Sequence, residues 1–383
     1  MESEALGRHV IIHAFLRWAE TAKTSDRAKA ASALARAYAS DAIGRDERNA
    51  AEMAMLFLLD DPAPKVRLAL AEALADCAEA PRAVIVALAE DQPEIAAQVI
   101  LRSQVLTDTD LVDLAAHGGD VTRSLIAHRR VLSRVVCAAL IEIGSVFDVL
   151  TLLANDGASL SKPSLKRICE RHGDDAEVRA LLLEREDLPS DARQALVEKV
   201  GSALAGFSLV QAAIGTSRVQ RVTREACDVA TIGLAADADA GEIDQLVEHL
   251  RVCGRLTPLF LMQALCAGRI EFFAAAIVNL SGQRERRVRS ILADGRQAAI
   301  RALFEASGLE RDVSALFADA VLLWRKDARR GAAPASVSAR LAARAGEALS
   351  GASRELLERI EGFSRAEQRQ SARAFAIQAQ VAA

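Results

Sequence analysis

The chain has 383 residues, of which 51% are apolar, 26% are charged and only 4% are aromatic. Its 48 basic and 52 acidic residues give a formal net charge of −4, which argues against the overall positive field of a general nucleic-acid binder. No apolar run approaches the roughly eighteen residues that a membrane-spanning helix needs, and no secretory leader precedes the first helix, so we expect a cytoplasmic protein with no membrane partner.

The composition favours helix over sheet along the whole chain. Alanine, leucine, glutamate and arginine, all good helix formers, are abundant, and alternating β-branched runs bounded by tight turns are essentially missing. The sequence therefore predicts an all-α fold. Six widely spaced cysteines without a Cys-x-x-Cys pair are expected to be reduced core residues: Cys77, Cys137, Cys169, Cys227, Cys253 and Cys266.

The N-terminal region, residues 1–55, is predicted to form two or three helices, His9 to Ala22, Asp26 to Ala39 and Asp46 to Leu59. His9 and His13 lie four residues apart and would share a helix face. Because no acidic residue or third histidine lies at ligand spacing near them, we expect no metal site there. No cofactor is expected in the rest of the chain either.

Residues 56–200 are predicted to consist of repeated helix pairs. Asp60-Asp61-Pro62 is followed by Asp91-Gln92-Pro93 and then by Gly119-Asp120, at a period of about thirty residues that corresponds to one helix pair per repeat. The predicted pairs are Asp61 to Leu74 with Pro81 to Glu90, Pro93 to Ser103 with Thr109 to Ala116, Val121 to Arg130 with Ser133 to Ile143, and Ser164 to His172 with Ala176 to Glu184.

The first repeat carries a more specific pattern. It resembles the HEAT-like repeat of bilin-lyase-type and other bacterial helical arrays, through Asp61, Pro64, Val66, Arg67, Ala69, Ala71, Glu72, Ala73 and Leu74. The resemblance implies an α-solenoid of degenerate HEAT-like helix pairs. In the next repeat Ala96 takes the place of the arginine, which argues against a regular ladder of Asp–Arg pairs along the stack.

A second resemblance covers more of the chain. The segment Gly254-Arg255-Leu256-Thr257-Pro258-Leu259, continuing through Gln263-Ala264-Leu265-Cys266-Ala267-Gly268 to Ile270-Glu271-Phe272-Phe273, resembles a bacterial family catalogued as domain of unknown function 2336. In that family an N-terminal array of degenerate helical repeats precedes such a segment. The likeness would span roughly residues 10 to 325. It implies an all-helical fold and no particular activity.

The same segment predicts the centre of a second core. Thr257 is placed to cap a helix that has Pro258 at its first position, and the apolar residues that follow indicate burial. Gly268 is expected to end that helix in a left-handed conformation. Because glycines interrupt the pattern between Gly201 and Ser217, we predict a helical domain over residues 206–326, followed by a linker and helix-prone tail over 327–383.

No catalytic motif stands out, so we expect no enzyme. The chain lacks a Gly-x-Ser-x-Gly elbow and a phosphate-binding loop ending in Lys-Ser or Lys-Thr. The strongest local charge is a basic cluster that could contact an anionic partner; it comprises Arg284, Arg286, Arg287 and Arg289. A solvated helix face is the simpler interpretation, since Glu285 dilutes the charge and no aromatic residue is interleaved for base stacking.

Three functions are compatible with these features. The first is a non-enzymatic protein-interaction scaffold or adaptor that binds a protein partner or forms a homodimer. The alternative is a helical-repeat protein that binds the phosphate backbone of nucleic acid through its arginines. A ligand-binding or lyase-like enzyme with a pocket between Leu256 and Leu280 is favoured least.

Overall fold

The computed structural model describes residues 17–40, 44–329, 336–343 and 351–362, together with Arg365, Arg369 and Ala372. Apart from one isolated parallel bridge between Leu132 and Ala158, the regular secondary structure of this part of the chain is helix, so the predicted all-α fold is confirmed. None of the described helices combines the length and hydropathy that crossing a bilayer requires. His9 and His13, with most of the helix predicted for them, lie outside the described residues.

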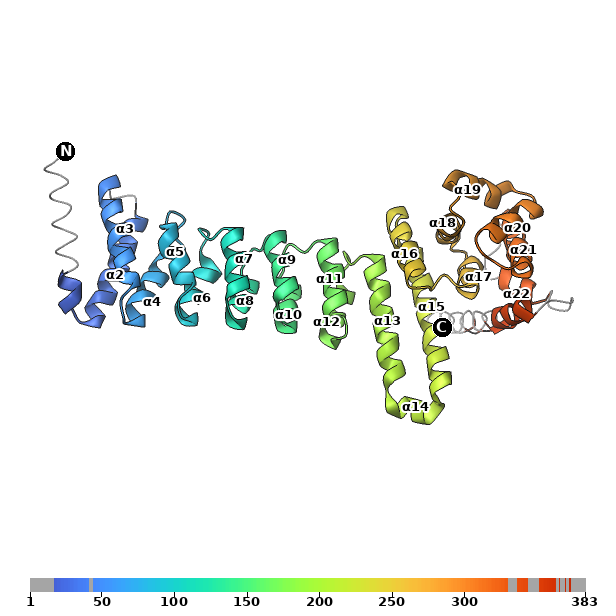
Figure 1. Ribbon diagram of the computed structural model, residues 1–383, viewed down its shortest axis with the longest axis horizontal. Coiled ribbons are helices and arrows are strands. Elements are labelled where there is room, and N and C mark those ends of the chain that lie inside the picture. Colours follow the sequence, from blue (N-terminus) through green and yellow to red (C-terminus); the bar gives the residue numbers. More distant parts are fainter. Residues whose placement is uncertain are drawn as a thin grey trace, which may run out of the picture. The chain divides into compact units, whose positions relative to one another are not determined.

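The chain divides into two compact units, Met1–Leu188 and Pro189–Ala383. The division precedes residue 200, where the repeats were predicted to end. In the first unit the helices follow one another in short steps (Figure 1). They are α2 (Thr24–Ala39), α3 (Arg45–Leu59), α4 (Pro64–Leu74), α5 (Arg82–Ala89), α6 (Pro93–Arg102), α7 (Asp108–His117), α8 (Asp120–Ala127), α9 (Arg134–Ile143), α10 (Val146–Ala154), α11 (Lys162–His172) and α12 (Ala176–Glu184).

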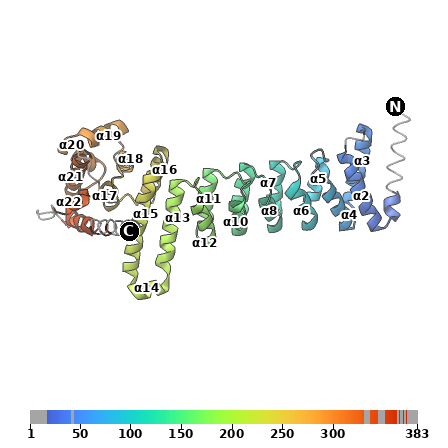
Figure 2. The same ribbon diagram turned by 180° about the vertical axis from the view of Figure 1, so that it is seen from behind.

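The helices of the first unit form two layers, which Figure 2 shows from behind. In one layer α2, α4, α6, α8, α10 and α12 each contact the next. In the other, α3 contacts α5, and α7, α9 and α11 contact one another in turn. Burial follows the expected period: Val66, Leu70 and Leu74 of α4 are all fully buried. Stacking thus supplies the core that no single helix pair could form.

Helix starts in this unit follow the local signals of the sequence. Proline occupies the first turn of α4, α6 and α11, where its missing N–H leaves no bond unmade. Ser133 and Asp175 cap α9 and α12 by accepting hydrogen bonds from backbone N–H groups of the first turn. Asp61 differs from this pattern. It accepts a hydrogen bond from the Ala63 N–H at 2.9 Å, outside α4, and its main partner is an arginine.

One helix of the first unit was missing from the predicted pairs. Helix α10 is capped by Ser145, whose hydroxyl accepts a hydrogen bond from the Asp148 N–H while the Asp148 carboxylate accepts one from the Ser145 N–H at 2.8 Å. Gly144 and this capping box separate α9 from α10 in only two residues, so the sequence there looks like one apolar run. The predicted pairs correspond to α4 with α5, α6 with α7 and α8 with α9. With α10 included, this series continues as α10 with α11, so α11 and α12 belong to different pairs.

Two ion pairs between an arginine and an aspartate, which we call rungs, join successive helices of the first layer. Arg27 of α2 donates to both carboxylate oxygens of Asp61, at 2.6 and 3.0 Å. Arg67, at the corresponding position of α4, donates to both oxygens of Asp91, at 2.5 and 2.9 Å. Ala96 takes this position in α6, and the series ends there, as the sequence indicated.

The rungs also set the ionisation of their carboxylates. Burial would by itself raise the pKa of Asp61, but hydrogen bonds from Arg27 and the Ala63 N–H, with the positive charge of the two arginines, hold that pKa below its usual range. The same opposition between burial and Arg67 lowers the pKa of Asp91. Both aspartates are therefore charged wherever the unit is folded near neutral pH.

The second unit contains a long helical hairpin and a compact core. Its elements are α13 (Ser190–Gly206), α14 (Ser208–Ile214), α15 (Thr216–Asp237), α16 (Ala240–Val252), α17 (Pro258–Cys266), α18 (Ile270–Ser281), α19 (Glu285–Asp294), α20 (Gln297–Ala306), α21 (Arg311–Ala328), α22 (Ser336–Ala342) and a further helix over residues 351–362. That last helix, assigned by the sequence to the tail, buries Leu356, Leu357 and Ile360 in the core.

The predicted second core is centred where the sequence placed it. Thr257 accepts a hydrogen bond from the Phe260 N–H and so caps α17, and Gly268 has a φ of 74°, which confirms both predictions. The ring of Phe273 lies 5.9 Å from that of Phe304 and 6.0 Å from that of Phe317, measured between centroids. These aromatic contacts join α18, α20 and α21.

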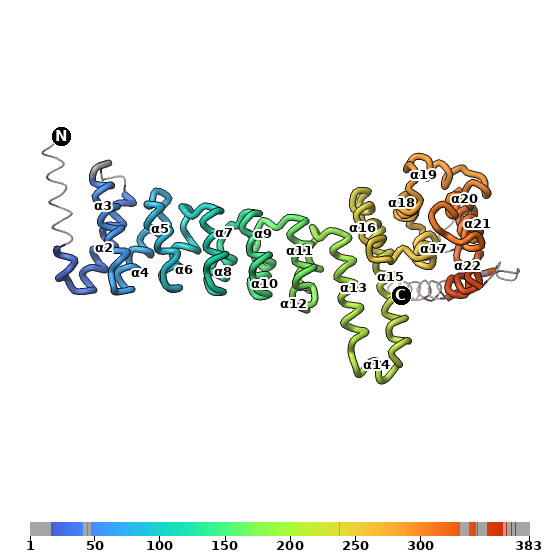
Figure 3. Tube along the Cα trace, viewed as in Figure 1, coloured from blue at the N-terminus to red at the C-terminus, as the bar shows by residue number. Residues whose placement is uncertain are grey.

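The prediction that Gly201 interrupts the helical pattern is wrong, because Gly201 lies inside α13. It is buried, and a Cβ added to it would come within 2.5 Å of the Cys227 Sγ on α15. Glycine therefore serves close packing of α13 against α15, which Figure 3 traces as one hairpin closed by α14. The chain reverses after Gly206 and at Gly215, which has a φ of 89°.

The prediction that all six cysteines are core residues is also wrong in part. Cys137, Cys169, Cys227 and Cys266 are buried, but Cys77 is only half-buried and Cys253 is exposed. Cys253 follows the last turn of α16, where the apolar pattern of the helix has already ended. None of the six is in a disulfide.

Candidate interaction surfaces

The basic cluster lies around the start of α19 in the second unit. Val288 is buried beneath it, as the helix periodicity predicts. Arg289 is already paired, since it donates to Glu271 at 2.5 Å and to Glu285 at 2.8 Å, and these bonds raise its pKa. The other three, Arg284, Arg286 and Arg287, are exposed and form no ion pair within the described residues. The structure thus leaves three of the four predicted arginines available to an anion.

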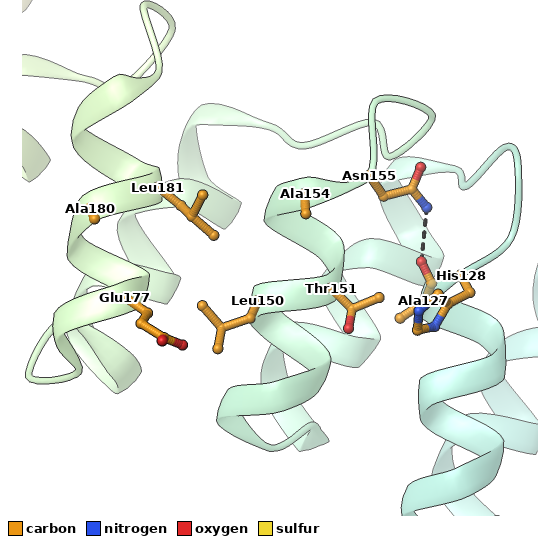
Figure 4. A pocket seen from close by; sticks show the side chains of 9 residues that line it. All are labelled: Ala127, His128, Leu150, Thr151, Ala154, Asn155, Glu177, Ala180 and Leu181. Carbon is orange, nitrogen blue, oxygen red and sulfur yellow. Dashed lines mark hydrogen bonds between the residues drawn. The ribbon is translucent and has the colours of Figure 1, made fainter.

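An open groove of about 650 Å³ crosses the first layer of the first unit at α8, α10 and α12. Figure 4 shows Leu150 of α10 and Leu181 of α12 directed toward each other across it. Ala154 and Ala180 leave room above the helix backbones. The remaining lining residues are Ala127, His128, Thr151, Asn155 and Glu177. The groove is therefore mainly apolar, with polar groups at its edges.

Most polar groups of this groove are committed to the fold. The Asn155 amide donates to the carbonyl oxygens of Ala127 and Arg129, both at 2.8 Å, and so caps the end of α8. The His128 Nδ1 lies 2.7 Å from the Ser124 carbonyl oxygen. Glu177 is exposed, and its carboxylate has no partner among the described residues. One free negative charge therefore lies at the edge of the groove.

A second hollow, of about 360 Å³, lies on the same unit near α5 and α7 and contains four carboxylates. Two of them are engaged: Asp91 by Arg67, and Asp110 by Arg82 and Thr107. Within the described part of the chain, no three histidine, cysteine or acidic side chains converge as metal ligands would. Here too the polar groups mainly hold helices together.

The region from Leu256 to Leu280, considered for a ligand pocket, is largely core. Every residue of α17 from Phe260 to Cys266 is buried. A hollow of about 350 Å³ begins only at Thr257, Pro258 and Leu259, against Leu309 and Leu356.

The end of the α13–α15 hairpin gathers most of the exposed large apolar side chains among the described residues of the second unit. We define the hairpin tip as residues 202–222. Helix α14 within it has no buried residue, and the Leu209 side chain is 81% exposed. The other large apolar side chains exposed there are Leu204, Phe207, Val210, Ile214 and Val222.

Comparison with known proteins places the chain in a family. A family model described as "uncharacterised protein conserved in bacteria (DUF2336)" matches residues 95–373. The chain belongs to this family. The resemblance to domain of unknown function 2336 is thereby confirmed, although the match begins later and ends further along the chain than the expected residues 10 to 325. No curated protein and no solved structure matches the chain.

The DUF2336 match includes the groove, the hairpin tip and the basic cluster, and it begins after both Asp–Arg rungs. The sequence had identified only the basic cluster among these surfaces. The groove was missed because α10 was missed, and the Ser145–Asp148 capping box was the available signal. The hairpin tip was interpreted as a glycine-rich boundary. Its signal was Phe207-Ser208-Leu209-Val210, an apolar run that no neighbouring pattern buries.

Proposed function

We propose that this protein is a non-enzymatic interaction scaffold of the cytoplasm, and that its first unit is an α-solenoid of degenerate HEAT-like helix pairs. Support for the solenoid comes from the two stacked layers and from the rungs at Arg27 and Arg67, which occupy equivalent helix positions. A stack of this kind presents a long continuous face, which suits an extended or helical segment of another protein.

The observation that carries the proposal is the groove across α8, α10 and α12. Its apolar centre at Leu150 and Leu181 fits a row of aliphatic side chains, and the small Ala154 and Ala180 allow a partner backbone to approach. The free carboxylate of Glu177 favours a basic residue at one edge of that partner. We therefore propose a partner segment that is apolar on one face and carries a nearby lysine or arginine.

The test compares two substitutions that add the same charge to the first unit. Leu181→Glu places a carboxylate in the groove, whereas Phe147→Glu changes an exposed residue of α10 outside it. Tagged full-length protein is cross-linked in cells and its partners are identified by mass spectrometry. A partner that is lost with Leu181→Glu and kept with Phe147→Glu supports the proposal. The same partners from both variants, or none from the unaltered chain, would contradict it.

Nucleic-acid binding is a second candidate, favoured by the three exposed arginines around α19. If Arg284, Arg286 and Arg287 contact phosphates, affinity for duplex DNA should fall steeply with salt and be lost when all three become glutamate. Arg301→Glu, on the neighbouring α20, is a control for one such charge reversal outside the cluster, because Arg301 already pairs with Glu305. Binding that ignores salt, or that survives the triple substitution, would remove this candidate.

A further inference from the structure

The hairpin tip combines exposed apolar side chains with a segment in which every charged residue is basic. Between Lys199 and Glu225 the sequence contains no carboxylate, and its charged residues there are Arg218, Arg221 and Arg224. All three arginines are exposed. Arg218 and Arg221 form no ion pair among the described residues, and at about 1.5 Å of rise per residue they lie within the first two turns of α15.

The apolar side chains of the tip lie beyond these cations. Phe207, Leu209 and Ile214 come from α14 and its flanking residues, at the far end of the hairpin from α16 (Figure 3). None of the three hollows described above is lined by residues of α14, and α14 has no buried residue. Apolar side chains that are exposed in this way are stabilised when an apolar medium closes around them.

We propose that the hairpin tip binds the surface of an anionic lipid bilayer, with α14 at the boundary between headgroups and acyl chains and the arginines of α15 against the lipid phosphates. The sequence prediction of no membrane partner rested on the lack of a spanning segment, and surface binding needs none. A second copy of the chain fits less well, because two tips would bring like charges together. An acidic protein surface shares the charge but would need its own pocket for Leu209.

Two energetic contributions would act together. Burial of apolar side chains in the interface provides attraction that does not depend on salt. Each arginine near an anionic surface adds a factor of about five in affinity, and this part weakens as salt screens it. A single apolar tip with a few cations therefore gives reversible binding.

The test uses the full chain and vesicles of two compositions, phosphatidylcholine alone and phosphatidylcholine mixed with phosphatidylglycerol. We expect co-sedimentation with the anionic vesicles, little with the neutral ones, and a decrease at high salt. Leu209→Glu should lower binding at least tenfold, and Arg218→Gln with Arg221→Gln about twentyfold to thirtyfold. Val131→Glu, at an exposed valine of the first unit, is the matched control and should bind normally.

Because Leu209, Arg218 and Arg221 are exposed, these variants should fold, which circular dichroism checks directly. No binding to anionic vesicles, equal binding to neutral ones, or binding unchanged by Leu209→Glu would each overturn the proposal. So would a protein partner recovered through the tip without vesicle binding. Leu181→Glu leaves the tip intact, so failure of the groove proposal and failure of this one are distinguishable.

Discussion

Gly201 provides a sharp test of how α13 packs against α15. In the interior of a helix, replacing glycine by alanine normally stabilises a protein by about 0.5–1 kcal/mol, because alanine loses less backbone entropy on folding. At Gly201 the added methyl group would lie 2.5 Å from the Cys227 Sγ and 3.1 Å from the Thr223 Cγ2. Both neighbours belong to α15, so the methyl group can be accommodated only if these two side chains move or the two helices shift apart.

Such overpacking costs about 1–3 kcal/mol, which exceeds the gain in helix propensity. We therefore expect Gly201→Ala to destabilise the second unit by about 1–2 kcal/mol. Gly233→Ala is the matched control in α15, because a Cβ there meets no atom within 4 Å, and it should stabilise by the normal amount. The two substitutions should thus change the free energy of unfolding in opposite directions.

Urea unfolding in a Trp18→Phe background measures this difference. Trp324 on α21 then reports the second unit alone. In a parallel thermal unfolding experiment, each kcal/mol should move the midpoint by about 2–4 °C for a unit of this size. Adding Cys227→Ala to Gly201→Ala should recover part of the loss, because it removes the clashing sulfur. If Gly201→Ala stabilises as much as Gly233→Ala, the close approach of α13 and α15 is refuted.

Three further predictions concern the rungs, the thiols and the core. Because the pKa of Asp91 is lowered in the folded state, its stabilising contribution should be present above about pH 4 and lost as pH falls below that value. The protection of α4 amides from hydrogen exchange, relative to the intrinsic rate at each pH, should therefore decrease below about pH 4, and it should change less in Asp91→Asn. Iodoacetamide should modify exposed Cys253 well before Cys137, whose burial raises its pKa to about 11; the reverse order, read by peptide mass spectrometry, would contradict the described burial. Phe273→Ala should cost the second unit about 3–5 kcal/mol in urea unfolding, and a loss below 1 kcal/mol would be inconsistent with its contacts to two other rings.

Local signals in the sequence predicted most helices and several of their ends. Val66, Leu70 and Leu74 recur at the helical period, and Thr257-Pro258 marks a helix start by residue chemistry alone. The errors occurred where a local signal has two meanings. A glycine such as Gly201 can end a helix or admit a neighbour, and the choice depends on which residue, here Cys227, lies opposite in space.

The candidate surfaces divide in the same way. Charge and exposure of Arg286 and Arg287 could be predicted, since a run of arginines cannot be buried without partners. That Arg289 is neutralised depends on Glu271, a residue of a different helix.

By itself the sequence determined that this chain is helical, where most of its helices begin, and to which family it belongs, because propensity, capping and periodicity are properties of neighbouring residues. Only the tertiary structure decided that α8, α10 and α12 share a groove, that α13 and α15 form a hairpin, and that Leu209 is left exposed. These features depend on contacts between residues distant in the chain, and no local pattern encodes which surfaces such contacts cover and which they leave open.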